Sequence, residues 1–333
     1  MNNEKLLEIK NLRQYFPVTE GVFKRKIGDV KAVDDVSLVV HKGETLGIVG
    51  ESGCGKTTMG RCVVRLNKPT SGEILFQDEN GTMKDIFSLS KQESFRLRQK
   101  IQIVFQDPYA SLNPTKNILS AFDEPLRIHG ISNAEERHAI AAKMMETVNL
   151  SPEYLERYPH EFSGGQRQRI CIAKALALNP ELIVCDEPVS ALDVSIQAQI
   201  MNLMRKLQKE YNLTYLFIAH DLSVVKYMSD RIAVMYLGKI VELAESTEIT
   251  QNCVHPYTQA LMSAVPIPKL GAKKKEILLT GDVPSPLDPP TGCRFHPRCS
   301  RCMEICKQKE PELQEIPGKP GHYCACHLLG SKE

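Results

Sequence analysis

A glycine-rich segment, Gly50–Thr57, constrains the chain more than any other feature. Its sequence, GESGCGKT, matches the pattern G-x-x-x-x-G-K-[ST]. It follows a short apolar run, Thr45–Val49, typical of a buried strand, and Lys56–Leu66 after it has helical spacing. In such a strand-to-helix turn, backbone N–H groups surround phosphate, the lysine reaches the β- and γ-phosphates and the threonine hydroxyl ligates Mg²⁺. The sequence therefore predicts an ATP site, the alternative being a glycine turn that only starts a helix.

Two carboxylates follow another apolar run. Leu182–Cys185 has the character of a buried strand, and Asp186 and Glu187 come directly after it. Asp186 is the expected Mg²⁺ ligand, and Glu187 is placed to polarise an attacking water as a general base. Taken alone, the two acids could instead cap the start of a helix. Together with the phosphate loop they predict ATP hydrolysis.

Strands and helices alternate along most of the chain, which predicts an α/β fold with a mostly parallel sheet. The amino-terminal residues alternate as strands on either side of an expected loop over 21–31. A polar stretch with helical periodicity and no good strand predicts a helical insertion over 117–162. The further strands are expected at 101–105, 181–185 and 213–219, and the further helices at 166–178 and 196–210.

Charge and hydropathy exclude several classes of protein. Among 333 residues, 42 Lys and Arg nearly balance 40 Asp and Glu. The resulting net charge of +2 is too small to favour binding to nucleic acid or to an anionic membrane. The first residues lack the pattern of a signal peptide, and no stretch of about 18 apolar residues could span a bilayer. We expect a soluble cytoplasmic chain.

The cysteines are unevenly distributed. Proline-rich stretches after about residue 245 lead to a tail that holds six of the 11 cysteines, namely Cys293, Cys299, Cys302, Cys306, Cys324 and Cys326. In a reducing cytosol, clustered cysteines indicate metal ligands before they indicate disulfides. The tail is therefore predicted to be a specialised segment.

The segment Phe162–Arg169, FSGGQRQR, lies before the two acids and resembles the signature sequence of the ABC ATPases. Phe162 stands where that family most often has Leu, while the Ser-Gly-Gly-Gln that follows is intact. The resemblance implies a P-loop (RecA-like) core with an N-terminal antiparallel β region, within a nucleotide-binding domain over 1–245 whose helical subdomain covers about 107–170. It also implies that the signature residues of one subunit close over the ATP of another: Ser163, Gly164, Gly165 and Gln166.

Further roles follow from the same resemblance. Gln106 resembles the Q-loop glutamine, Asp193 belongs to a D-loop-like Ser190–Asp193, and His220 resembles the switch histidine. Phe16 lies where an aromatic ring stacks on adenine, although a buried core aromatic is the alternative. The catalytic residues implied are Glu187, His220 and Gln106, and the Mg²⁺ ligands are Thr57, Gln106 and Asp186. The ATP-binding residues are Phe16, Gly50, Glu51, Ser52, Gly53, Cys54, Gly55, Lys56, Thr57 and Thr58.

Four further segments narrow the resemblance to the dipeptide/oligopeptide importer ATPases, in particular their F-type subunit. They are QYFP at 14–17, QDPYASLNP at 106–114, HPYT at 255–258 and GDVPSP at 281–286. This implies a second ATPase subunit in a hetero- or homodimer, two transmembrane permeases, an extracytoplasmic solute-binding protein and a peripheral position at the cytoplasmic face of the inner membrane. A nickel importer remains an alternative. A non-transport ABC ATPase acting on DNA or ribosomes, or an ATP-binding regulator, fits the single cassette and its Glu187 less well.

In the C-terminal extension, residues 246–333, the spacing Cys293-x5-Cys299-x6-Cys306 followed by Cys326 resembles the subfamily's [4Fe–4S] ligand set. Four thiolates suit such a cluster. Zinc is an alternative, because Cys299-x2-Cys302 forms a tetrahedral half-site that Cys324, Cys326 or His327 could complete. Free reduced thiols are the third possibility, and the sequence assigns no role to Cys302 or Cys324.

Overall fold

A computed structural model describes residues 4–21, 25–264 and 277–329. By its contacts the chain divides into two compact units. The first unit comprises Met1–Glu4, His41–Glu44 and Ser88–Ile218, and the second comprises Lys5–Val40, Thr45–Phe87 and Ala219–Glu333.

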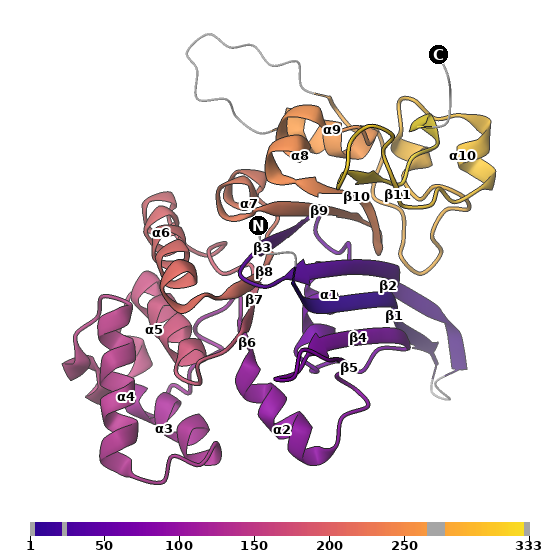
Figure 1. Cartoon of the computed structure of the whole chain (residues 1–333). Coiled ribbons are helices and arrows are strands. Elements are labelled where there is room, and N and C mark those ends of the chain that lie inside the picture. Colours follow the sequence, from indigo (N-terminus) through magenta and orange to yellow (C-terminus); the bar gives the residue numbers. More distant parts are fainter. Residues whose placement is uncertain (1–3, 22–24, 265–276, 330–333) are drawn as a thin grey trace. The chain divides into compact units, whose positions relative to one another are not determined.

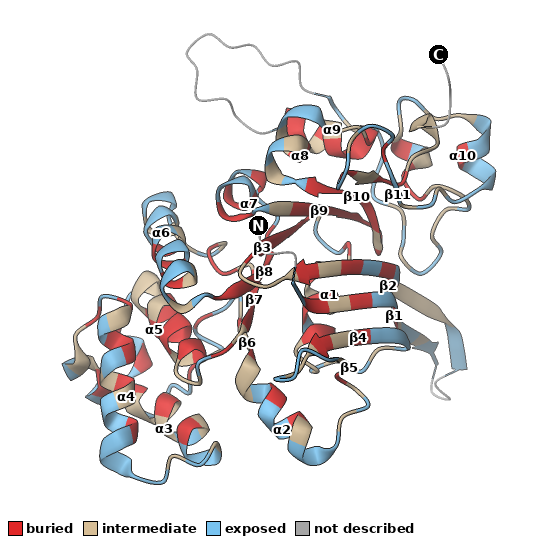
Figure 2. Cartoon of the chain, in the orientation of Figure 1, coloured by how far each residue is buried: buried red, intermediate tan, exposed pale blue. Residues whose placement is uncertain are grey.

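The strands of the first unit form a parallel ladder in the order β6–β7–β8. They are β6 (Ile101–Val104), β7 (Leu182–Asp186) and β8 (Thr214–Ile218). Every residue of β7 and β8 is buried, as expected for apolar runs inside a parallel sheet (Figure 2). Val104 lies opposite Cys185, and Asp186 lies opposite Ile218, so the three strands end at the same edge.

The helices of the first unit include the predicted insertion. They are α2 (Lys91–Lys100), α3 (Ile118–Ile128), α4 (Ala134–Thr147), α5 (Gly164–Leu176) and α6 (Val194–Tyr211), with short 3₁₀ turns at Pro152–Glu156 and Pro159–Glu161. Figure 1 shows α3, α4 and α5 packed together, and their shared core includes the fully buried Phe122, Met145 and Ile170. The helical prediction for 117–162 is confirmed, and the strands and helices predicted between 166 and 219 lie within a few residues of those observed.

The second unit begins with an antiparallel sheet in the order β2–β1–β4–β5 (Figure 1). Its strands are β1 (Lys5–Glu20), β2 (Arg25–His41), β4 (Ser71–Gln77) and β5 (Met83–Asp85). The expected loop over 21–31 is wrong from Arg25 onward, because β2 already runs through these residues. As an edge strand, β2 tolerates the charged and solvent-exposed side chains that hide its strand character in the sequence.

A second sheet in this unit carries the phosphate loop and extends into the C-terminal part. The parallel pair β3 (Thr45–Val49) and β9 (Arg231–Tyr236) is followed by antiparallel β10 (Lys239–Glu245), β12 (Tyr323–Cys324) and β11 (Gln314–Glu315). Because β12 pairs with β10, the C-terminal extension continues the sheet. The predicted connector Val265–Pro268 lies outside the described residues.

Short helices complete the second unit. They are α1 (Lys56–Val63), α7 (Leu222–Met228), α8 (Ser246–Asn252), α9 (Pro256–Ser263) and α10 (Glu304–Gln308), with 3₁₀ turns at His296–Arg298 and His327–Leu329. Helix α7 packs on β3 at Gly47, where an added Cβ would lie 2.5 Å from a Val225 methyl carbon. The glycine therefore lets the helix approach the strand closely.

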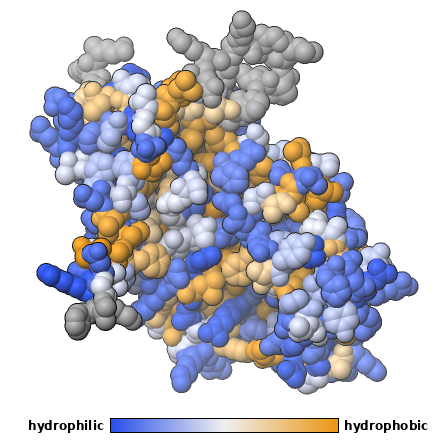
Figure 3. Space-filling view, turned by 180° about the vertical axis from the view of Figure 1, so that it is seen from behind, coloured by the Kyte–Doolittle hydropathy of each residue, from blue (hydrophilic) through white to orange (hydrophobic). Residues whose placement is uncertain are grey.

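Hydrophilic residues cover much of the face seen in Figure 3, and hydrophobic residues lie among them in separate groups. Several large apolar side chains are well exposed, among them Val194, Leu278 and Tyr109. Scattered exposed apolar residues are ordinary on a folded protein. None of the helices among the described residues has the length and hydrophobicity needed to span a lipid bilayer.

A fully buried carboxylate ties the extension to the sheet. Glu242 in β10 accepts the backbone N–H of Val254 at 2.7 Å and that of His255 at 3.1 Å. Its Oε1 also lies 2.8 Å from Nε2 of His322, just before β12. A buried carboxylate is tolerated only when such partners compensate for its lost hydration. Glu242 therefore joins three segments of the second unit.

We expect Glu242→Ala to lower the free energy of unfolding by about 3–5 kcal/mol, because it leaves buried N–H groups and His322 without their partner. Glu245→Ala, at the exposed end of the same strand, is the matched control and should change it by less than about 0.5 kcal/mol. Urea denaturation followed by circular dichroism measures both. Equal, small effects of the two variants would contradict the role given to Glu242.

Candidate functional site

The phosphate loop leaves β3 through two glycines that no other residue could replace without strain. Gly50 has φ 158°, and a Cβ there would lie 2.0 Å from the backbone oxygen of Met235. Gly55 has φ 105°, and its Cβ would lie 2.0 Å from the oxygen of Ala32. These approaches force the loop to run close against neighbouring backbone before α1 begins. Gly53 faces open space instead, and its φ of 79° alone requires glycine.

Lys56, the first residue of α1, is 4% exposed. Its Nζ donates to the backbone oxygens of Gly50 and Glu51 at 2.8 and 3.0 Å. Three donors on one ammonium can exchange such carbonyls for phosphate oxygens. The buried Cys54 has its Sγ 3.8 Å from Nζ, and burial raises the pKa of this thiol, so it stays neutral beside the lysine. Thr57 and Thr58 follow, half-buried, in the first turn of α1.

Phe16 lies in β1 with 40% of its surface exposed. This exposure excludes the alternative of a buried core aromatic and leaves its ring accessible for stacking. The preceding Tyr15 is half-buried and donates its hydroxyl to Asp34. Burial and this carboxylate raise the pKa of Tyr15 to about 12. His220, also in the second unit, is exposed and lies just before α7.

The carboxylates and the predicted Q-loop glutamine meet in the first unit. Gln106 follows β6, Asp186 ends β7 and Glu187 comes next, and the parallel register brings them to one edge. The Gln106 Nε2 donates to Oε2 of Glu187 at 3.0 Å. Asp186 is 3% exposed, while Glu187 is half-buried. Glu187 takes a φ of 48°, unusual for such a residue and a mark of functional sites when the surroundings impose it.

The signature segment forms the start of α5, also in the first unit. Ser163 and Gln166 make a capping box, with the Ser163 Oγ accepting the Gln166 N–H at 3.3 Å and the Gln166 Oε1 accepting the Ser163 N–H at 3.0 Å. A Cβ on Gly165 would lie 2.6 Å from a methyl carbon of Ile196, so glycine lets α5 begin close to α6. Asp193, exposed, precedes α6. The helix start thus has the positive dipole end suited to phosphate.

The cysteines of the tail gather in one lobe of the second unit. The Cys293 N–H donates to the Cys306 oxygen at 2.8 Å. Burial, with a smaller contribution from Cys306, Cys326 and Cys299, raises the pKa of Cys293 to about 12. Among the described residues, no three Cys, His, Asp or Glu side chains are placed to hold a metal ion. The structure therefore does not show the predicted metal site.

Comparisons with known proteins agree with the fold and with the predicted ATP-binding motifs. The family model for ABC transporters matches residues 33–190. A solved dimeric structure of the ATP-binding cassette MJ0796, in a post-hydrolysis state with ADP and phosphate, superposes with a TM-score of 0.62 at 31% identity. That match covers 72% of this chain and 99% of the solved cassette. The fold and the two groups of residues thus define an ABC ATPase.

More specific relatives extend over nearly the whole chain. The oligopeptide transport ATP-binding protein AppF of Bacillus subtilis is 56% identical over 98% of both chains. The dipeptide transport ATP-binding protein DppF of Haemophilus influenzae is 49% identical over 94% of both. Residues 241–306 also match the oligopeptide/dipeptide transporter C-terminal region. The chain belongs to the oligopeptide/dipeptide transporter family of ABC ATP-binding proteins, which confirms the resemblance and the F-type relationship.

Sequence reasoning missed the side chains that hold the phosphate loop from outside. Arg298 pairs with Glu51, and Tyr257 accepts the Glu51 N–H. Tyr257 belongs to the segment HPYT, whose similarity to relatives was the only signal available. Arg298 lies next to Cys299 within the cysteine-rich stretch, and no pattern in the sequence marks it as a partner of the phosphate loop.

We expect Lys56→Ala to weaken Mg-ATP binding roughly 10- to 150-fold, because a charge-assisted phosphate contact worth about 1.5–3 kcal/mol is lost. Lys68→Ala removes the same charge from an exposed position after α1 and should bind as the unaltered chain does. Calorimetric titration with a non-hydrolysable ATP analogue compares the three proteins. Unchanged affinity of Lys56→Ala would show that the loop does not bind the triphosphate.

Proposed function

We propose that the chain is the ATP-hydrolysing motor of an importer for di- and oligopeptides, coupling ATP-driven closure of a dimer to solute uptake. The observation that supports this most directly is the 3.0 Å contact between Gln106 and Glu187. It sets the predicted general base beside a predicted Mg²⁺ ligand, at the strand edge where Asp186 also ends. The peptide-transport names of relatives that match nearly end to end support the solute class.

The chemistry follows from the roles of a few groups. Lys56 and the loop N–H groups would hold the β- and γ-phosphates, and Phe16 would stack on the adenine. Thr57, Gln106 and Asp186 would bind Mg²⁺, which neutralises charge as the γ-phosphoryl group leaves. Glu187 would take the proton of the attacking water, and His220 would contact the γ-phosphate. Because phosphoryl transfer needs little covalent help, positioning and charge supply most of the acceleration.

The signature residues would act on a second subunit's ATP. In the capping box, the side chains of Ser163 and Gln166 each accept the backbone N–H of the other residue. These two hydrogen bonds fix the direction in which the first turn of α5 presents its remaining N–H groups. Asp193 would lie in the loop that passes between the two cassettes. The chain then completes each composite site only as a dimer, with a second copy or with a related ATPase subunit.

A groove in the first unit offers a docking place for the membrane partner. It has a volume of about 360 Å³ and is lined by residues of the helical insertion and the segment before it, among them Leu112, Ile118, Pro125 and Ile128. Ile128 is 55% exposed, so an apolar surface is available. We assign this groove to a short cytoplasmic helix of one of two permeases, which would hold the chain at the cytoplasmic face of the inner membrane. An extracytoplasmic binding protein would deliver the solute.

Glu187→Gln should keep Mg-ATP binding, lower the rate of hydrolysis about 10²- to 10⁴-fold and accumulate the closed dimer, because only the proton acceptor is lost. Phosphate release measures turnover, and size-exclusion chromatography with ATP measures the dimer. Glu210→Gln makes the same change at an exposed site near the end of α6 and should hydrolyse ATP normally. Undiminished hydrolysis by Glu187→Gln would refute the assigned base.

For the tail we propose a [4Fe–4S] cluster on Cys293, Cys299, Cys306 and Cys326. The support is the spacing of these cysteines in the sequence, the 2.8 Å backbone hydrogen bond from Cys293 to Cys306, and the suitability of soft thiolates for iron–sulfur clusters. Within the zinc alternative, His327 is a weaker candidate ligand than Cys324 or Cys326, because its Nε2 already lies 2.8 Å from the Lys309 oxygen. When bound, the cluster would cross-link a segment too small to form its own core. To bind the cluster, the cysteine thiols must lose their protons, although burial raises the pKa of Cys293, Cys299 and Cys326 and so favours the protonated form.

Protein purified without oxygen should be brown and contain about four iron and four sulfide per chain. Cys293→Ser should lose most of both, whereas Cys253→Ser, in the same extension but outside the predicted set, should keep them. Iron and acid-labile sulfide assays with a visible spectrum provide the measurement. A colourless sample that contains zinc, or no metal, would overturn the cluster assignment.

A further inference from the structure

The C-terminal extension grips one residue of the phosphate loop from two sides. The Arg298 guanidinium donates through both terminal nitrogens to the Glu51 carboxylate, at 2.7 and 3.1 Å. The Tyr257 hydroxyl accepts the backbone N–H of Glu51 at 2.9 Å. We call Arg298 and Tyr257 the Glu51 clamp. A bidentate guanidinium–carboxylate pair fixes direction as well as distance, so the clamp restrains both the side chain and the backbone of Glu51.

Both members of the clamp are themselves held firmly. Tyr257 is fully buried, and its ring packs against Tyr236 and Phe295 with centroids 4.7 and 5.4 Å apart. Arg298 is 9% exposed and closes a 3₁₀ turn, its N–H donating to the Phe295 oxygen at 3.0 Å. The Glu51 carboxylate raises the pKa of Arg298, so the guanidinium keeps its charge. The clamp is therefore preorganised by an aromatic core that Phe295 of the extension and Tyr236 of β9 form together.

Glu51 passes this restraint to the phosphate-binding lysine. Its backbone oxygen accepts from Nζ of Lys56 at 3.0 Å, so the residue held by Arg298 is also the residue that positions Lys56. On the other side of Glu51, Gly50 is fixed by its close approach to Met235. A contiguous path of contacts thus runs from Arg298 through Glu51 to Lys56.

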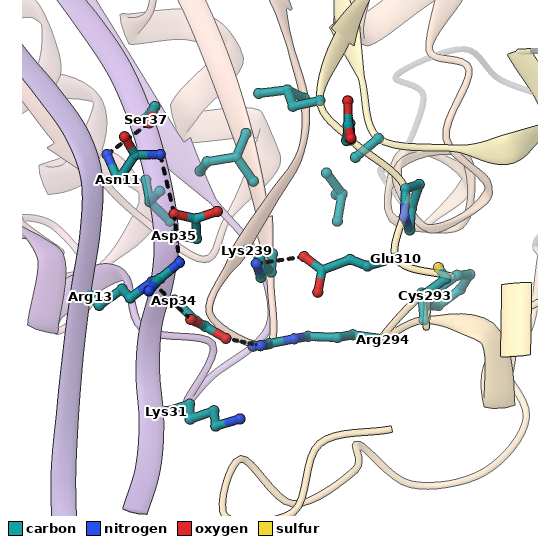
Figure 4. A pocket seen from close by; sticks show the side chains of 18 of the residues that line it. Asn11, Arg13, Lys31, Asp34, Asp35, Ser37, Lys239, Cys293, Arg294 and Glu310 are labelled. Carbon is teal, nitrogen blue, oxygen red and sulfur yellow. Dashed lines mark hydrogen bonds and ion pairs between the residues drawn. The ribbon is translucent and has the colours of Figure 1, made fainter. Parts of the chain in front are cut away.

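A second arginine of the same segment contacts β2. Arg294 pairs with Asp34 and donates to the Leu237 oxygen at 2.5 Å, and Figure 4 shows Arg294 and Arg13 meeting Asp34 from opposite sides. Asp34 also accepts the hydroxyl of Tyr15, the residue before Phe16. These groups line a cavity of about 710 Å³ between β1, β2 and the extension. The stretch of chain that carries Arg294 and Arg298 therefore contacts β2 at Asp34 as well as the phosphate loop at Glu51, and Asp34 in turn holds the residue before Phe16.

We propose that Arg298 and Tyr257 are positioning residues for the phosphate loop, so that the C-terminal extension sets the affinity of the chain for Mg-ATP. This inference rests on the phosphate-binding role proposed for Lys56. The physical reason is preorganisation: a loop already held in place loses less conformational freedom when it closes on a triphosphate. By thermodynamic reciprocity, bound nucleotide must then stabilise the contacts of the extension by the same factor.

The test compares the affinity for a non-hydrolysable Mg-ATP analogue among matched variants. Arg298→Gln and Glu51→Gln should each weaken binding by roughly 5- to 50-fold, within the usual range of coupling between sites. The double variant should lose no more than either single one, because both remove the same contact. Arg298→Lys keeps the charge and one contact and should bind with intermediate affinity. Tyr257→Phe keeps the aromatic packing but removes the hydroxyl that contacts Glu51, so the affinity should fall by a few-fold.

Two controls separate positioning from folding. Arg301→Gln changes an exposed arginine of the same lobe and should bind as the unaltered chain does. At saturating ATP, Arg298→Gln should recover most of its turnover, since its defect lies in KM rather than kcat. Hydrogen exchange gives an independent readout: nucleotide should slow exchange in residues 293–306 of the unaltered chain but not of Glu51→Gln. If Arg298→Gln fails to fold, Glu51→Gln carries the test because it leaves the extension intact.

Normal affinity in both Arg298→Gln and Glu51→Gln, with binding still lost in Lys56→Ala, would overturn the clamp and leave the proposed function standing. Additive losses in the double variant would likewise overturn it. If Lys56→Ala also binds normally, the failure belongs to the phosphate-loop assignment itself.

Discussion

The path of the phosphate loop depends on two places where backbone meets backbone. Gly50 lies against the oxygen of Met235 in β9, and Gly55 lies against the oxygen of Ala32 in β2, with no room for a side chain at either. The loop is thereby set against strands of both sheets of the second unit. The loop residues between these two glycines need other contacts to fix their positions. Glu51, the first of them, is held by Arg298 and Tyr257 of the C-terminal extension.

The first unit places its chemistry by equally simple means. Parallel strands in register bring Gln106 and the two carboxylates to one edge, and a capping box fixes the start of α5. In both cases backbone hydrogen bonding determines where the functional side chains lie. Motifs of this kind can be found in a sequence because strand, turn and helix start are local properties.

Local signals also explain how much could be predicted from sequence. The phosphate loop, the acids at the end of β7 and the helical insertion all come from short patterns, and the strands and helices predicted around them are confirmed. The run Arg25–Lys31 was missed because an edge strand tolerates charges that normally indicate a loop. The partners of Glu51 could not be predicted, since Arg298 lies 247 residues away and no periodicity connects two such positions.

The pairing of β12 with β10 has a consequence for how this protein can be divided. The C-terminal extension is not a separate appendage of the nucleotide-binding domain. It supplies the strand that pairs with β10, the histidine that contacts the buried Glu242, and the tyrosine whose hydroxyl contacts Glu51. A chain shortened after Glu245 would leave the carboxylate of Glu242, now buried, without the partners that the extension provides. Domain-swap chimaeras between this family and shorter cassettes therefore need matching substitutions in the sheet and the loop, not only a compatible boundary.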